Sequence, residues 1–176
     1  MQEVVKPVQG ARDFSRREFI ASSAVASSLM LLESGARAED AKPVADADKL
    51  HVALVGFGAQ GRVLLESLVK IDMIKLVAIV DIWDYARDYG VKYLRKMGIE
   101  VNAYESHEEL LAKQKDLQAV VVATPDFWHS PVSCACLEAG LDVYCEKMMS
   151  NTVDGARKMV HAMKKTGNLM QIGHQL

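Results

Sequence analysis

The chain has 176 residues, of which 50% are hydrophobic and 25% are charged. These values are typical of a globular protein and exclude wholesale disorder. The 21 Lys and Arg against 23 Asp and Glu give a formal net charge of −2, so no general attraction to nucleic acid is expected. Three cysteines are too few for a disulfide scaffold. The length allows one domain, or one domain and a tail.

The first 38 residues are typical of an export signal. Residues 15–20 read Ser-Arg-Arg-Glu-Phe-Ile, the twin-arginine pattern, and an uncharged segment rich in Ala and Ser covers 19–32. That segment is shorter than the roughly 20 apolar residues that span a bilayer, so no stable membrane anchor is expected. Ala36-Arg37-Ala38 supplies a cleavage site. We interpret 1–38 as a twin-arginine signal peptide, with the export machinery as partner and a periplasmic or extracellular location. A chance Arg-Arg pair before a buried helix is the alternative.

From residue 50 onward the sequence alternates between strand and helix patterns, after a flexible polar lead-in over 39–49. Helical spacing predicts helices between the strands, and Ser106 with Glu109 forms a capping box at the start of one of them. The alternation indicates βαβ units and predicts an α/β, Rossmann-type doubly wound parallel sheet over 50–176. Buried strands are predicted at 52–55, 76–80, 100–103, 119–123, 142–145 and 169–172, and helices at 62–70, 83–97, 106–113, 129–139 and 153–166.

A glycine-rich turn follows the first predicted strand and opens the first helix. It reads Gly56-Phe57-Gly58-Ala59-Gln60-Gly61 and fits G-x-G-x-x-G. In this pattern the first glycine permits a tight turn, the second lets the backbone approach a pyrophosphate, and the third allows close helix packing. The helix N-terminus presents N–H groups and partial positive charge to phosphate. The turn therefore predicts dinucleotide binding, with a ligand-free glycine turn as the alternative.

Asp81 ends the second predicted strand, where a carboxylate can accept hydrogen bonds from the adenosine ribose hydroxyls. The same charge repels the additional phosphate of NADP, and residues 82–84 supply no cation to receive that phosphate. NAD is therefore the expected cofactor and NADP the less favoured one. Trp83 could flank the adenine, or it could be a core or surface aromatic.

Two further segments should reach the same crevice, because ligands of open parallel sheets lie beyond the carboxyl ends of the strands. They are Thr124-Pro125-Asp126-Phe127-Trp128-His129 and Glu146-Lys147-Met148. Together with the glycine turn, Val80-Asp81 and the run V-Y-C-E-K at 143–147, they resemble the glucose–fructose oxidoreductase/inositol dehydrogenase (Gfo/Idh/MocA) family. The resemblance covers residues 49–176.

This resemblance implies the NAD(P)-binding half of an enzyme that moves hydride between a nicotinamide and a sugar or polyol. Lys147 matches a family lysine that contacts substrate and nicotinamide ribose, so we expect it to be catalytic. Thr124, Pro125, His129 and Glu146 match residues near the nicotinamide half of the cofactor. A solvated surface lysine and a structural helix-start histidine are the alternatives at 147 and 129. Met148 replaces the usual family proline.

The family's general-base histidine and substrate surface belong to a C-terminal α/β domain, which we expect these 176 residues to lack. Cofactor binding is therefore expected of this chain, and turnover by the chain alone is not. Two alternatives stay open: the cofactor half of an NAD-dependent glycosidase, and a stand-alone dinucleotide-binding module without catalysis. Family members commonly associate, which leaves a homo-oligomer open.

No metal site is predicted, since the cysteines fit no ligand spacing. Cys134, Cys136 and Cys145 are expected to be small buried hydrophobes, with a disulfide left open. His107 and His161, on predicted helices without a surrounding motif, are expected at the surface, and His174 could face the cleft.

Replacing Arg16 and Arg17 by lysine is expected to hold the protein in the cytoplasm, because the export machinery reads the arginine pair. Cell fractionation of the variant measures this, with Arg12→Lys as the matched control. Unchanged export of the double variant would refute the twin-arginine assignment.

Overall fold

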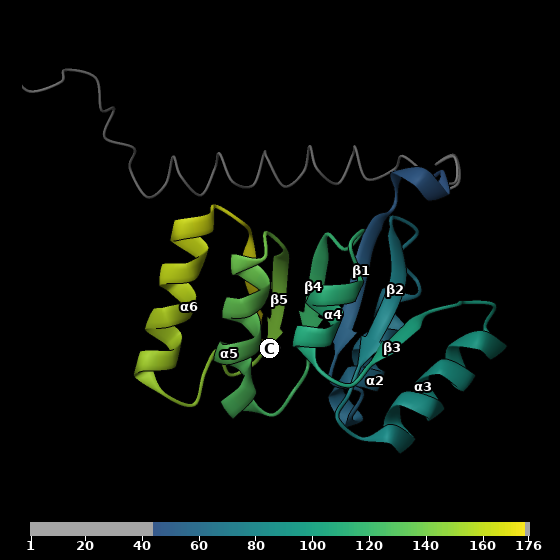
Figure 1. Ribbon diagram of the computed structural model, residues 1–176, viewed down its shortest axis with the longest axis horizontal. Helices are drawn as coiled ribbons and strands as arrows, with labels where there is room; N and C mark the ends of the chain where they lie inside the picture. The colour runs from purple at the N-terminus through teal and green to yellow at the C-terminus, as the bar shows by residue number, and fades with distance from the viewer. Residues whose placement is uncertain (1–43, 175–176) are drawn as a thin grey trace, which may run out of the picture. The chain divides into compact units, whose positions relative to one another are not determined.

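Six parallel strands form one sheet in the order β3-β2-β1-β4-β5-β6 (Figure 1). The strands are β1 Leu50–Val55, β2 Ile74–Val80, β3 Asn102–Tyr104, β4 Ala119–Val122, β5 Asp142–Glu146 and β6 Met170–Gly173. The structure is a computed structural model that describes residues 44–174. The signal peptide predicted over 1–38 lies outside the described residues. The sheet confirms the predicted Rossmann-type doubly wound fold.

Helices cover the sheet in two layers, each with its own apolar cluster. On one face, α2 (Ala59–Leu68) and α3 (Asp84–Lys96) bury Leu65 and Leu94 against β1 and β2. On the other face, α4 (His107–Lys113) packs on β2 and β3, α5 (Asp126–Glu138) packs on β4 and β5, and α6 (Val153–Thr166) packs on α5. These helices bury Leu110, Leu137 and Met159 in the second cluster. A short 3-10 helix, η2 (Asp46–Asp48), precedes β1.

The chain reverses its direction of travel across the sheet between β1 and β4, which are hydrogen-bonded neighbours. From β1 it runs through β2 to β3, and after the crossover it runs from β4 through β5 to β6. At such a switch point the loops that follow the two strands diverge to opposite faces and leave a crevice at their carboxyl ends. The fold therefore directs ligand binding to the edge where β1 and β4 end.

Two helices begin three residues earlier than the sequence pattern predicts. The helix expected at 62–70 begins at Ala59, within the glycine turn, and the helix expected at 129–139 begins at Asp126. In α5 the Trp128 N–H already bonds the Pro125 carbonyl at 2.9 Å. The early starts bring both helix N-termini to the crevice, because each follows its strand after only a few residues.

The predicted capping box is half formed. The Ser106 hydroxyl accepts the Glu109 N–H at 3.2 Å, as expected for an N-cap. The Glu109 carboxylate accepts the N–H of Glu105 at 2.9 Å rather than that of Ser106. The cap still satisfies one of the first N–H groups of α4 and fixes where the helix begins.

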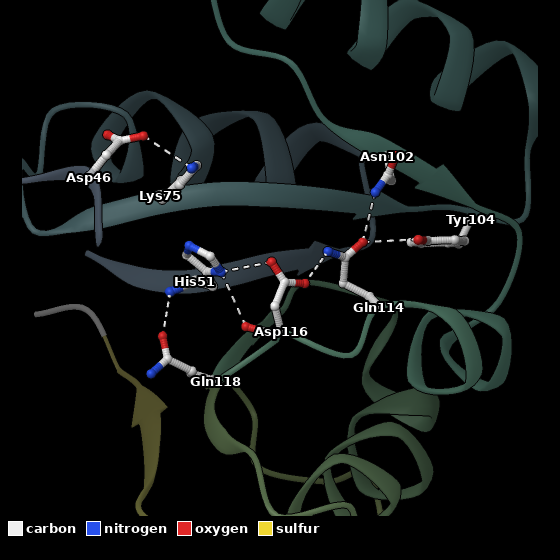
Figure 2. A network of polar contacts seen from close by, with 8 residues as sticks. All are labelled: Asp46, His51, Lys75, Asn102, Tyr104, Gln114, Asp116 and Gln118. Atoms are coloured by element: carbon white, nitrogen blue, oxygen red, sulfur yellow. Dashed lines mark hydrogen bonds and ion pairs between the residues drawn. The ribbon is translucent and has the colours of Figure 1, made fainter. Parts of the chain in front are cut away.

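The amino ends of the strands are joined by a polar network, shown in Figure 2. His51, at the start of β1, has its Nδ1 2.9 Å from a carboxylate oxygen of Asp116 and donates its backbone N–H to the Gln118 side-chain oxygen at 2.9 Å. Gln114 bonds Asp116 and accepts from the Tyr104 hydroxyl at 2.9 Å. The side-chain hydrogen bond from Gln114 is the main cause that lowers the pKa of Asp116, and a backbone hydrogen bond and the nearby His51 contribute less. These bonds tie the loop before β4 to β1 and β3.

The three cysteines are free thiols. Cys136 and Cys145 are fully buried, and burial raises their pKa values to about 12 and about 11. Cys134 is only half-buried. The expected hydrophobic role is confirmed for the two buried thiols, which remain protonated and unreactive near neutral pH. Within residues 44–174, no helix is long and apolar enough to cross a bilayer.

Candidate functional site

The glycine turn between β1 and α2 is packed too closely for side chains at its first and third positions. Gly56 has a φ of 97°, and a Cβ there would lie 2.6 Å from the Ala123 carbonyl oxygen. A Cβ on Gly61 would lie 2.0 Å from the Gly56 carbonyl oxygen. Both positions therefore need glycine for internal reasons: a left-handed backbone at Gly56 and direct contact between helix and turn at Gly61.

Gly58, the second glycine, has no such internal requirement. Its φ is −74°, which any residue adopts, and a Cβ there would meet nothing within 4 Å. It lines a cavity and is the N-cap of α2, where unpaired N–H groups face outward. The open space above Gly58 is what a pyrophosphate needs in order to approach the backbone, so the residues present fit a dinucleotide.

Asp81 connects the glycine turn to the loop after β2. One carboxylate oxygen accepts the Phe57 N–H at 2.8 Å, and the other accepts the Trp83 N–H at 2.9 Å. The guanidinium of Arg87 donates to the backbone carbonyl of Asp81 at 2.7 Å. Each carboxylate oxygen keeps acceptor capacity beyond its one N–H bond, because an ionised carboxylate offers about four lone-pair sites.

A cavity of 420 Å³ opens at the carboxyl ends of β1, β2 and β4. Its floor is the glycine turn, and its walls come from the loops that follow β2, β3 and β4 (lower edge of the sheet in Figure 1). The lining is mostly apolar with a few polar groups, the usual make-up of a small-molecule site. The lining includes Gly56, Phe57, Gly58, Arg62, Asp81, Ile82, Trp83, Ser106, His107, Thr124, Pro125, Phe127 and Trp128.

Thr124 contributes an unpaired polar atom to this cavity. Its Oγ1 is buried and has no hydrogen-bond partner among the described residues. A buried hydroxyl without a partner costs free energy, about 1–3 kcal/mol in mutational studies. Since Thr124 lines the cavity, a bound ligand can supply the missing partner. The unpaired hydroxyl is a second observation that fits an occupied site.

Comparisons with known proteins agree with this geometry. Residues 50–174 match the Gfo/Idh/MocA model, described as an oxidoreductase family with an NAD-binding Rossmann fold. An inositol 2-dehydrogenase of Rubrobacter xylanophilus is 35% identical over 130 residues, which are 73% of this chain and 36% of that protein. The chain belongs to the Gfo/Idh/MocA family. The predicted family membership is thereby confirmed.

Other Gfo/Idh/MocA relatives differ in their chemistry. A glycosyl hydrolase family 109 protein of Stenotrophomonas maltophilia is 31% identical over 159 residues, covering 86% of this chain and 34% of that protein. The WlbA dehydrogenase of Chromobacterium violaceum, solved with NADH and UDP-GlcNAcA, superposes with a TM-score of 0.65 at 27% identity. That match covers 76% of this chain and 37% of the other. The chain thus spans about a third of the length of these relatives.

Glu146 is the last residue of β5, one residue beyond the predicted strand end, and Lys147 follows the strand. Glu146 is 3% exposed and accepts from the Gln60 side chain at 3.0 Å and from the Lys147 N–H at 3.1 Å. Gln60 thereby joins the start of α2 to the end of β5. Lys147 is exposed and lies outside the lining of the 420 Å³ cavity. Its peptide bond to Met148 is cis. The catalytic role of Lys147 and the cofactor contact of Glu146 stay predictions.

His129 lies beneath the cavity, in the first turn of α5, and is 1% exposed. Its Nδ1 is 2.6 Å from the Met148 carbonyl oxygen and its Nε2 is 2.9 Å from the Thr124 carbonyl oxygen. A neutral imidazole can donate to only one of these carbonyls, and an imidazolium to both. Whichever form is present, the ring joins the loop after β4 to the loop after β5. Its predicted contact with the cofactor stays a prediction.

The sequence predictions missed two lining residues, His107 and Arg62. His107 was expected at the surface, but its side chain is only 11% exposed and packs edge-on against Trp128, with ring centroids 6.3 Å apart. Arg62 lies one residue past the glycine motif and reaches the cavity. The early starts of α2 and α5 place Arg62 and Trp128 there. His161 is exposed, as expected.

A larger hollow of 730 Å³ lies at the opposite edge of the sheet, beside the network in Figure 2. Its charged lining includes His51 and Asp116, which already pair with each other, and Lys49, which pairs with Asp46. It lies at the amino ends of the strands, away from the switch-point crevice. Among residues 44–174, no three His, Cys, Asp or Glu side chains cluster as metal ligands.

Gly58→Ala and Gly61→Ala form a matched pair that separates ligand binding from folding. Gly58→Ala is expected to leave unfolding free energy unchanged or raised by up to about 1 kcal/mol. NADH affinity should fall about tenfold, since a Cβ there denies phosphate an amide hydrogen bond. Gly61→Ala is expected to destabilise the fold by about 1–3 kcal/mol through overpacking. Urea unfolding and NADH titration measure both; equal stability losses in the two variants would contradict this assignment.

Proposed function

We propose that the chain is the cofactor-binding half of an exported oxidoreductase that transfers hydride between NAD and a sugar or polyol. One observation carries the proposal. The glycine turn with its open Gly58, the Asp81 carboxylate and the unpaired Thr124 hydroxyl border a single cavity at the switch point. Its place and polar groups match what a dinucleotide requires.

In this proposal each end of the cavity binds a different part of NAD. The N-terminal N–H groups of α2 hold the pyrophosphate over Gly58. The two oxygens of Asp81, oriented by the Phe57 and Trp83 N–H groups, accept the adenosine ribose hydroxyls. Thr124 lies on the other side of the turn and supplies a hydroxyl toward the nicotinamide half. The negative charge of Asp81 disfavours an additional phosphate on that ribose and so favours NAD over NADP.

The reaction would take place beyond the ends of β4 and β5. The nicotinamide supplies the hydride acceptor or donor when it is bound. Lys147 places an ammonium at the end of β5, where it can donate a hydrogen bond to a substrate hydroxyl and orient it. Gln60 and the buried Glu146 hold that strand end against the glycine turn at 3.0 Å. The chain's own residues thus bind the cofactor and position one charged group, while the substrate surface belongs to the family's other domain.

A second candidate is the cofactor half of an NAD-dependent glycosidase. The observation that favours it is the 31% identity to a glycosyl hydrolase family 109 protein over 86% of this chain. In such an enzyme the same sugar is oxidised and then re-reduced, so no net change in NADH appears. A third possibility is a stand-alone dinucleotide-binding module that catalyses no reaction. Turnover measurements on the natural protein distinguish such a module from the two enzymes.

NADH titration of the 176-residue chain tests cofactor binding directly. The two tryptophans, Trp83 and Trp128, both line the cavity, so bound NADH should quench tryptophan emission and gain emission by energy transfer. Asp81→Asn is expected to weaken NADH about tenfold or more, because it removes the charge from the ribose acceptor. Asp154→Asn on α6 is the matched control. The absence of a saturable signal at millimolar NADH would overturn the proposed function.

Lys147→Ala tests whether Lys147 contacts the substrate and contributes to turnover. In the enzyme that includes the family's substrate domain, this variant is expected to keep NADH affinity and to lose most turnover, because Lys147 meets substrate rather than the adenosine half. Lys158→Ala, on exposed α6, is the control. Turnover equal to that of the parent enzyme would remove Lys147 from the catalytic residues.

A further inference from the structure

Arg62 brings a positive charge into the cavity that NAD binding, as proposed above, does not use. It is exposed in the first turn of α2 and lines the same 420 Å³ cavity as Asp81 and Trp83. Within residues 44–174 it forms no ion pair with a carboxylate, whereas nearby Arg87 is engaged by Asp84 and by the Asp81 carbonyl. Arg62 is therefore the cation at this end of the cavity whose terminal N–H donors are free for a ligand.

The position of the Arg62 guanidinium is fixed by two aromatic rings. Its central carbon lies 4.9 Å from the centroid of the Tyr89 ring and 5.8 Å from that of Phe57. Its Nε donates to the Phe57 carbonyl at 3.5 Å, a long contact. Stacking on aromatic rings restrains a guanidinium without consuming its terminal donors. The side chain is thus oriented in advance, and the loss of conformational entropy on binding an anion is reduced.

Asp81 and Arg62 act on the same part of a dinucleotide. Asp81 is the acceptor for the adenosine ribose hydroxyls, so a phosphate on that ribose would lie close to Asp81. Arg62 lines the same cavity as Asp81, so its charge can offset the repulsion, and a guanidinium bonds phosphate oxygens through two parallel N–H groups. The repulsion is also reduced because each Asp81 oxygen already accepts a backbone N–H.

We propose that Arg62 receives the 2′-phosphate of NADP(H), so that this cavity takes both NAD(H) and NADP(H). The inference rests on the proposed dinucleotide function and adds to it the residue that admits the phosphorylated cofactor. The relative affinity for NADP(H) and NAD(H) then depends on two opposing charges: the Asp81 carboxylate repels the 2′-phosphate and the Arg62 guanidinium attracts it. Arg62 lies on α2 and not in the loop after β2 that contains Asp81, so the residues next to Asp81 in the sequence do not indicate this cation.

The test compares NADPH and NADH titrations of the 176-residue chain and of Arg62→Gln, followed by tryptophan quenching. NADPH affinity is expected to fall about tenfold or more in the variant, the usual effect of losing a charge-assisted phosphate contact. NADH affinity should change less than about threefold, within the range of a near-neutral surface substitution. Arg62→Lys keeps the charge and should lose less NADPH affinity. Arg157→Gln on α6 is the matched control.

Each outcome separates this inference from the function it rests on. Saturable NADH binding with no NADPH binding by the parent chain would overturn the role of Arg62 and leave the proposed function standing. Equal weakening of both cofactors in Arg62→Gln would overturn it too, and would assign Arg62 to the adenine or the pyrophosphate. Failure of the parent chain to bind either dinucleotide would overturn the proposed function itself. A steeper salt dependence for NADPH than for NADH supports the ion pair.

Discussion

The site depends on the direct contact between helix α2 and the turn that precedes it. A Cβ at position 61 would lie 2.0 Å from the Gly56 carbonyl oxygen, so only glycine lets the first turn of the helix pack against that carbonyl. That contact brings the helix N-terminus to the end of β1, so its free N–H groups face the cavity rather than solvent. Arg62 reaches the cavity for the same reason, because it follows Gly61 directly. One close backbone contact thus positions both the helix N-terminus proposed to bind phosphate and the Arg62 charge that follows it.

The remaining walls are held by bonds that join one loop to another. Asp81 joins the glycine turn to the loop after β2, Gln60 and Glu146 join the turn to β5, and His129 joins the loops after β4 and β5. The polar network at the amino ends of the strands stabilises the opposite edge in the same way. At the carboxyl edge these bonds connect the loops around a mostly apolar cavity that has a few oriented polar groups.

A structural feature could be predicted from the sequence where the residues that indicate it lie close together along the chain. The glycine turn and Asp81 lie next to strands whose apolar runs are unambiguous, so the fold and the cofactor class of the family could be inferred, whereas the ribose-acceptor role of Asp81 stays a prediction. The helix starts at Ala59 and Asp126 were predicted late, because glycine and proline interrupt the apolar spacing there. The places of Arg62 and His107 depend on how distant segments meet. The two carbonyl partners of His129 likewise lie in different loops, beyond the reach of spacing arguments.

Asp81 has a double role that affects how this protein could be redesigned. Its carboxylate is at once the proposed ribose acceptor and the receiver of two backbone N–H groups that shape adjoining loops. Substitutions that exchange this acid for a small or neutral residue, a common route to altered cofactor preference, would also release both loops. Selectivity and loop conformation are therefore inseparable at Asp81, whereas Arg62, held by ring stacking and one long hydrogen bond, offers a position where preference can be tuned independently.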